Sequence, residues 1–233
     1  MRDSEIDDIL GEDSGQADPA LLDRISDQLG TTLRPVRPMP PAWILALALF
    51  LSSTAIAVVG AAILGFYGFV SLTAAQFAWI FPVVGLAAWG ASALSSAETI
   101  PGSRQRVTPP ILLALCILAI VAVFALLFHD YATAGFVHWG VRCLVAGLIE
   151  ALPTGLVAWL VLRRGLALNP GAAGLAAGTL AGLTGLAMLE LHCPSHLALH
   201  VMIWHVGVVP IAALAGALIA WLAAKIHPTS AQR

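Results

Sequence analysis

The chain has 233 residues, of which 59% are hydrophobic and only 10% are charged, and its mean hydropathy is +0.90. A soluble domain carries about 25% charged residues because its surface faces water. The composition therefore excludes a soluble globular protein and predicts an integral membrane protein. Three cysteines are too few for a disulfide scaffold, although one pair could still form.

Residues 1–42 form an acidic segment ahead of the first apolar run. The segment holds nine acids and four arginines, so its net charge is −5. It lacks the basic patch that phosphate contacts need, which argues against direct nucleic-acid binding, and it does not resemble a cleavable signal peptide. Within it, Asp18 is a typical helix N-cap, Pro19 suits the first turn of a helix, and Gly30 suits its end.

A short amphipathic helix is predicted between Asp18 and Gly30. Its apolar side chains recur at helical spacing, with acidic ones between them. The apolar residues are Leu21, Leu22, Ile25 and Leu29, and the acidic ones are Asp23 and Asp27. An isolated helix of this length is marginal in water, so we expect its apolar stripe to need a partner. The alternative is a helix lying on the membrane surface, where an acidic helix suits an anionic leaflet poorly.

Six apolar runs follow a proline-stiffened linker that ends at Trp43. Each run has about the 20 residues that a helix needs to cross a bilayer. They lie at 42–66, 73–96, 110–128, 136–162, 171–191 and 197–223. The sequence thus predicts an all-α polytopic membrane protein with six transmembrane helices. Its parts would be a tail at 1–42, a transmembrane domain at 43–226 and a second tail at 227–233.

Basic residues predict the orientation of these helices. Six spans place both termini on one side, and nearly all Lys and Arg residues fall on that side: Arg34, Arg37, Arg104, Arg106, Arg163, Arg164 and Lys225. The opposite loops, 67–72, 129–135 and 192–196, contain no Lys or Arg. The positive-inside rule therefore places both termini in the cytoplasm. The exception is Arg142, near the outer end of the fourth span.

Topology brings Cys143 and Cys193 to the outer face. Around them fall several polar side chains, which are His138, Arg142, Glu190, His192, His196 and His200. His196 and His200 are four residues apart on one helix face, a usual spacing for a metal-binding pair. Together with cysteine they suit a thiophilic or zinc-like metal. The alternative is a group of interfacial polar residues that hydrogen-bond one another. For the thiols we favour function, since this side of an inner membrane is oxidising.

The sequence assigns no single role to several other residues inside the spans. His205 is five residues beyond His200, so on an α-helix it should not share that face closely. Glu150 lies near mid-membrane, where an ionisable group is either functional or a protonated carboxyl bonded to a neighbouring helix. Cys116 is expected to pack. In the fifth span, glycines at every fourth position predict close helix contact; these are Gly174, Gly178 and Gly182.

No feature predicts an enzyme. The chain has no soluble catalytic domain, no Gly-rich phosphate loop and no metalloprotease motif of the type His-Glu-x-x-His. The sequence therefore favours a protein that binds and senses, and no cofactor is required for such a role. The alternative is a membrane metal-handling protein or transporter that uses Cys193, His196, His200 and Glu150.

Several motifs resemble the family called negative regulator of sigma F, or NrsF. They are Leu33–Trp43 (LRPVRPMPPAW), Arg163-Arg164-Gly165 with Asn169-Pro170, and the Cys193-Pro194 turn followed by Trp204. Six spans and a short cytoplasmic N-terminal segment match as well. Two features depart from the family's pattern: His205 follows Trp204 where a tyrosine is expected, and histidines are more numerous around Cys193.

The resemblance implies an anti-sigma factor in a bacterial inner membrane. Such a protein holds an extracytoplasmic-function sigma factor away from core RNA polymerase and releases it on an envelope signal such as heavy-metal or oxidative stress. It also implies that Cys143 and Cys193 sense the signal. The sigma factor would then dock on the apolar stripe of the tail, with Asp23 and Asp27 at the rim of the contact.

Overall fold

The computed structural model describes residues 20, 23–24, 26–28, 40–100, 103, 107–133, 135–165 and 167–226. Residues 1–39 and 40–233 form two separate units. In the first unit the described residues are helical and exposed, Asp23 and Asp27 among them. Several predicted features lie outside the described residues: the stripe residues Leu21, Leu22, Ile25 and Leu29, the linker up to residue 39, the loop arginines Arg104 and Arg106, and the tail 227–233.

The second unit is a bundle of helices. They are α3 (Ala42–Leu64), α4 (Tyr67–Ser71), α5 (Ala74–Ala97), α6 (Pro109–Leu127), α7 (Phe136–Leu162), α8 (Pro170–His192), α9 (Ala198–His200), the π-helix η1 (Val201–His205) and α10 (Val206–Ile226). Six spans are long and apolar enough to cross a membrane, the last one comprising α9, η1 and α10 together. The described residues contain no strand, so the predicted fold class is confirmed.

Local sequence signals set where these helices begin and end. Thr73 and Gln76 form a capping box at the start of α5. The Asn169 side chain accepts a hydrogen bond from the Ala172 backbone N–H at 3.1 Å and so caps α8. Gly65 follows α3 with a φ of 102°, a conformation that other residues rarely adopt. The predicted bounds therefore agree closely with the observed ones, the largest difference being the end of the last span.

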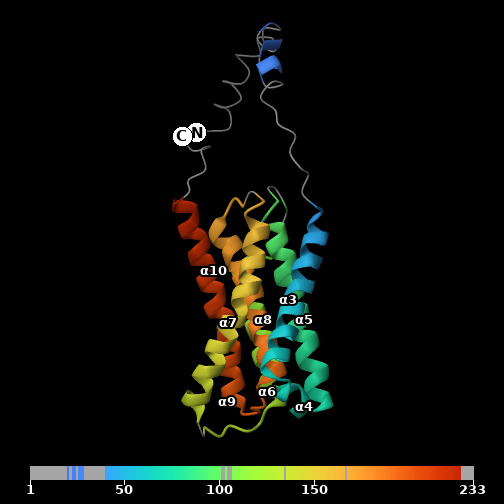
Figure 1. Cartoon of the computed structure of the whole chain (residues 1–233), viewed down its shortest axis with the longest axis vertical. Helices are drawn as coiled ribbons and strands as arrows, with labels where there is room; N and C mark the ends of the chain where they lie inside the picture. Colours follow the sequence, from blue (N-terminus) through green and yellow to red (C-terminus); the bar gives the residue numbers. More distant parts are fainter. Residues whose placement is uncertain are drawn as a thin grey trace, which may run out of the picture. The chain divides into compact units, whose positions relative to one another are not determined.

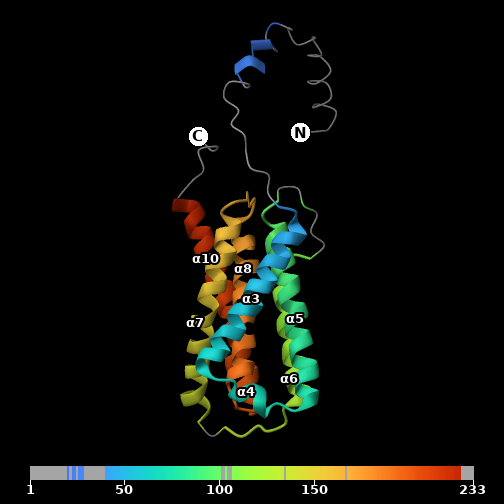
Figure 2. The ribbon, with the colours of Figure 1, turned by 45° about the vertical axis from the view of Figure 1, so that its right-hand side comes forward.

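Helix α8 lies in the middle of the bundle (Figures 1 and 2). Within its most apolar window 83% of the residues are buried, against 17–33% in the other five spans. It packs against α10, α7, α5 and α3. Its glycines face α10: a Cβ at Gly182 would lie 2.6 Å from the Cα of Val209, and Gly174 and Gly178 also abut the α10 backbone. The predicted close contact is confirmed.

Gly182→Ala should therefore destabilise the bundle. The added methyl group would meet backbone, which cannot rotate away as a side chain can, and such overpacking typically costs about 1–3 kcal/mol. For a chain of this size each kcal/mol of lost stability lowers the melting temperature by roughly 2–4 °C. Thermal unfolding of the purified protein in detergent measures it. Gly85→Ala in α5 is the matched control, because nothing lies within 4 Å of a Cβ there; an equal loss in both variants would contradict the packing argument.

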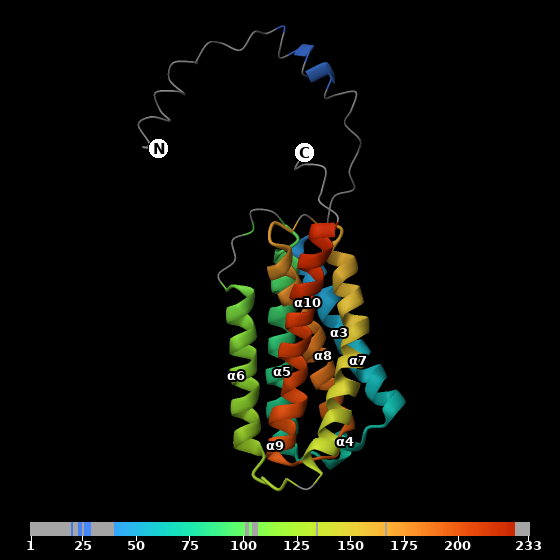
Figure 3. The same ribbon diagram turned by 90° about the vertical axis from the view of Figure 1, so that its left-hand side faces the viewer.

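The two ends of the bundle differ. Figure 1 shows α4 and α9 at one end, here called the α4–α9 end, and the start of α3 and the end of α10 at the other. Helix α6 stands at the edge (Figure 3). At the α4–α9 end, the Ala198 backbone N–H donates to the Asp130 carbonyl at 2.7 Å and ties the segment after α6 to the start of α9. This end holds both cysteines of the predicted outer cluster.

Candidate metal centre

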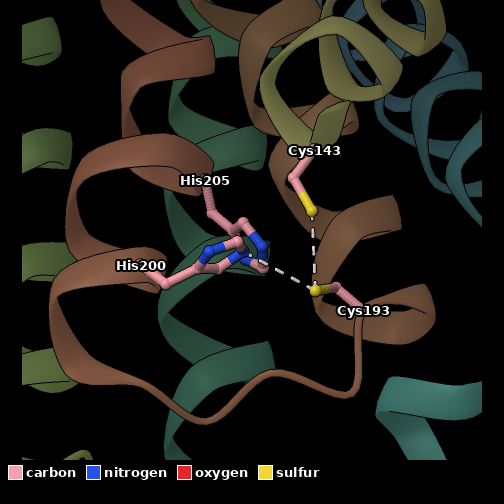
Figure 4. Close-up of side chains that lie close together, drawn as sticks. All are labelled: Cys143, Cys193, His200 and His205. Carbon is pink, nitrogen blue, oxygen red and sulfur yellow. Dashed lines mark hydrogen bonds between the residues drawn. The ribbon is translucent and has the colours of Figure 1, made fainter. Parts of the chain in front are cut away.

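Four side chains gather at the α4–α9 end (Figure 4). They are Cys143 from α7, Cys193 at the C-cap of α8, His200 from α9 and His205 from η1. Their ligand atoms all lie within 4.8 Å of one another. The Sγ atoms of Cys143 and Cys193 are 3.6 Å apart, and the Cys193 Sγ lies 3.8 Å from His200 Nε2. The two thiols are therefore as close as the sequence led us to expect.

The π-helix explains why His205 belongs to this group. On an α-helix, residues five apart diverge, which is why His205 was not expected to share a face with His200. Residues Val201–His205 instead form the π-helix η1, whose wider turn brings positions five apart together. The rings of His200 and His205 consequently lie 5.1 Å apart between centroids. That expectation was wrong; the sequence signal for an irregular helix is Pro210, whose ring crowds the Val206 carbonyl just beyond η1.

A buried carboxylate orients His205. Glu190 is 4% exposed, His205 is 1% exposed, and Glu190 Oε1 lies 2.6 Å from His205 Nδ1. Nδ1 is therefore engaged in a hydrogen bond with the carboxylate. The other ring nitrogen, Nε2, has no hydrogen-bond partner among the described residues. A histidine held by a carboxylate on one nitrogen and free on the other is the usual arrangement of a metal ligand.

The environment of Cys193 favours its thiolate. The hydrogen bond with Cys143 and the nearby imidazoles of His200 and His205 lower the pKa of the Cys193 thiol below its ordinary value, while partial burial acts in the opposite direction. The thiolate is both the nucleophile and the metal-binding form of cysteine. Cys193 is thus suited to react with an oxidant or to bind a metal.

The other predicted polar residues lie around this group. The His196 ring stacks on Phe128 at 5.9 Å, and its nitrogens have no partner among the described residues. His192 Nδ1 donates to the Gly65 carbonyl at 2.9 Å. His138 and Arg142 are exposed, both beside Trp139. Of the four predicted metal ligands the structure brings together Cys143, Cys193 and His200, and it places His205 where His196 was expected.

A family model described as negative regulator of sigma F matches residues 29–225. The chain belongs to the NrsF family. The match contains five spans, all but the last residue of the sixth, and both cysteines of the group, whereas Leu21, Leu22 and Ile25 precede it. Comparisons with curated proteins and with solved structures gave no match.

In this NrsF-family chain a cavity adjoins three of the four side chains. Its volume is about 570 Å³, and Cys143, Cys193, His200 and Arg142 are among the residues that line it. The cavity extends beside the thiols, so a small ion or oxidant has space next to the sulfur atoms.

Helix α3 touches the elements that carry the group. A Cβ at Gly60 of α3 would collide with the Glu150 carboxyl of α7, so this half-buried carboxyl is seated against α3. Just beyond α3, a Cβ at Gly68 of α4 would lie 2.5 Å from the Glu190 carbonyl oxygen and 2.8 Å from that of Cys193. The backbone that positions Cys193 is therefore in direct contact with the segment that follows α3.

Proposed function

We propose that this chain is a membrane-bound anti-sigma factor. It holds an extracytoplasmic-function sigma factor at a bacterial inner membrane and releases it under metal or oxidative stress in the envelope. The observation that carries the proposal is the family match over residues 29–225, because a negative regulator of a sigma factor implies a sigma-factor partner. The protein acts by binding and sensing rather than by catalysis. Co-purification with an extracytoplasmic-function sigma factor of the same bacterium tests this function.

The N-terminal segment supplies the sigma-binding surface. Its apolar stripe needs a partner because an isolated helix of this length is marginal in water. The stripe consists of Leu21, Leu22, Ile25 and Leu29, with Asp23 and Asp27 at the rim. A segment that orders only on binding gives up part of its contact energy, so its affinity is moderate and a signal of a few kcal/mol can switch it off.

The thiols of Cys143 and Cys193 supply the sensor. Their 3.6 Å separation supports a joint change of state, either a disulfide or a shared thiophilic metal. To form a disulfide the two thiols lose two protons and two electrons, which an envelope oxidant accepts. Either event moves the start of α7 relative to the end of α8.

Helix α3 carries this movement across the membrane. It meets Glu150 of α7 through Gly60, and the segment after it meets the Cys193 backbone through Gly68. Its first residue, Ala42, follows the N-terminal segment directly in the chain. These contacts support a route from the thiols through α3 to the proline-stiffened linker that joins it to the sigma-binding stripe.

Both termini should lie in the cytoplasm. The exposed Arg163, Arg164 and Lys225 lie at the ends of α7 and α10, away from the cysteines, and the positive-inside rule assigns that side to the cytoplasm. Reporter fusions at Gly102 and Gly165 should report cytoplasm, and a fusion at Ala132 should report periplasm. A periplasmic N-terminus would exclude the anti-sigma function, since the tail could not reach a cytoplasmic sigma factor.

A membrane metal-handling protein or transporter is the second candidate function. The observation in its favour is the cysteine and histidine group together with Glu150 inside a span. Metal flux into vesicles that contain the purified chain, without any binding of the sigma factor, would favour this function over the first.

A further inference from the structure

We propose that Cys143, Cys193, His200 and His205 form a closed four-ligand site for a zinc-class divalent ion, with Glu190 as the positioning residue that holds His205. Only the signalling role of the ion depends on the proposed anti-sigma function. Ion binding itself needs no sigma factor. The two can therefore be tested, and can fail, separately.

The distances fit one ion. A tetrahedral zinc ion with Zn–S bonds near 2.3 Å and Zn–N bonds near 2.0 Å sets its ligands roughly 3.3–3.8 Å apart. The Cys143 and Cys193 sulfurs are 3.6 Å apart, and Cys193 Sγ and His200 Nε2 are 3.8 Å apart. All four ligand atoms lie within 4.8 Å of one another. A separation of at most 4.8 Å leaves each ligand atom within about 1.5 Å of the spacing that a shared zinc ion needs.

An unpaired buried nitrogen points to the same conclusion. His205 is 1% exposed, and its Nε2 lacks a hydrogen-bond partner among the described residues. Leaving such a nitrogen without a partner is unfavourable, because burial removes the water that would otherwise solvate it. Glu190 already holds Nδ1 at 2.6 Å, which turns Nε2 to the side where His200 and the thiols lie (Figure 4). A bound ion would give this nitrogen its partner.

The donor atoms select the class of ion. Two thiolates and two imidazoles are ligands for zinc and for its softer congener cadmium, whereas magnesium and calcium take oxygen ligands. With four protein ligands no coordination position is left for water, which is the pattern of a site that holds structure rather than one that catalyses. The ligands come from α7, the end of α8, α9 and η1. A bound ion would thus fasten together three of the six spans at the α4–α9 end.

Cobalt is the probe for this site. The full-length chain, purified in detergent, reduced and stripped of metal with a chelator, should bind one equivalent of Co²⁺ and show both thiolate-to-cobalt charge-transfer absorption and the visible bands of a tetrahedral ion. Zinc or cadmium should then bleach the spectrum. X-ray absorption of the zinc-loaded wild-type chain should count two sulfur and two nitrogen neighbours. A folded chain that gives no charge-transfer absorption, or an oxygen-dominated shell, would overturn the proposal.

Matched variants assign the ligands. Cys143→Ser, Cys193→Ser and His205→Ala should each lose the tetrahedral spectrum, and His196→Ala should keep it, since His196 lies at the same end but outside the group. Glu190→Gln should keep the spectrum but weaken cobalt affinity about 10–100-fold, as typically follows when the carboxylate that orients a metal-binding histidine is lost. An unchanged spectrum in His205→Ala, or its loss in His196→Ala, would refute the ligand set. If the chain binds metal but no sigma factor, the metal site is supported and the anti-sigma function is wrong. If it binds a sigma factor but no metal, the anti-sigma function is supported and the metal site is wrong.

Discussion

Replacing both Leu22 and Ile25 with Asp should release the sigma factor constitutively while the membrane bundle stays inserted. Both residues belong to the predicted stripe, which lies outside the described residues. Burying an aliphatic side chain is worth roughly 1.5–3 kcal/mol, so losing two removes roughly 3–6 kcal/mol. With about 1.4 kcal/mol per tenfold change in affinity, binding should fall by about two to four orders of magnitude. Transcription from a sigma-dependent promoter measures the release.

The control for this variant is Asp3→Ala, which changes the acidic stretch without touching the stripe and should leave repression unchanged. Immunoblots of the membrane fraction should show equal amounts of both variant chains. Undiminished repression by the double Asp variant would place sigma recognition elsewhere, in the cytoplasmic loops around Arg104 and Arg163.

Cys143→Ser and Cys193→Ser should each abolish most of the response to metal or oxidant and leave basal repression intact. A serine hydroxyl cannot form a disulfide and is a poor ligand for a soft metal. Either change therefore prevents both the disulfide and the metal shared by the two sulfurs. The sigma-binding stripe is in another part of the chain and remains unaltered. The induction ratio of the same reporter, with and without cadmium or peroxide, measures the effect.

Cys116→Ala is the matched control for the cysteine variants. Cys116 is a buried thiol of α6, 4% exposed, and it does not belong to the four-residue group. Its replacement should therefore leave the induction ratio normal. If both serine variants also respond normally, the sensor role of Cys143 and Cys193 is wrong. If they do not respond while His196→Ala and His200→Ala do, the two histidines are interfacial residues only.

The sequence predicts the membrane bundle well because each span is encoded by its own continuous apolar run. An apolar run long enough to span a bilayer can only be helical, since its backbone groups find no water there. The six spans and their bounds follow from this requirement. The glycine repeat of α8 likewise predicts a close helix contact, and the structure shows that the contacting helix is α10. Span order also places both thiols at the same face of the membrane, whereas their 3.6 Å separation comes from the packing of α7 against α8.

The finer arrangement of the site could not be read from the sequence. Placing His205 beside His200 depends on five residues adopting a π-helix. Choosing His196 as a ligand assumed that it shares a helix face with His200, whereas α9 begins only at Ala198 and His196 lies in the turn before it. The pairing of Glu190 with His205 depends on how α8 and η1 pack. Gly60 beside Glu150 is a contact between helices that are far apart in sequence. Each of these features is set by tertiary packing, which spacing along one helix does not encode.

The most direct test of the account is reconstitution of the full-length chain in lipid nanodiscs with a purified extracytoplasmic-function sigma factor of the same bacterium. The account predicts a complex that survives size-exclusion chromatography, that forms in competition with core RNA polymerase, and that is lost when Leu22 and Ile25 are both changed to Asp. A sigma factor that does not bind the nanodisc-embedded chain, or that binds it equally well while attached to core polymerase, would contradict the anti-sigma function.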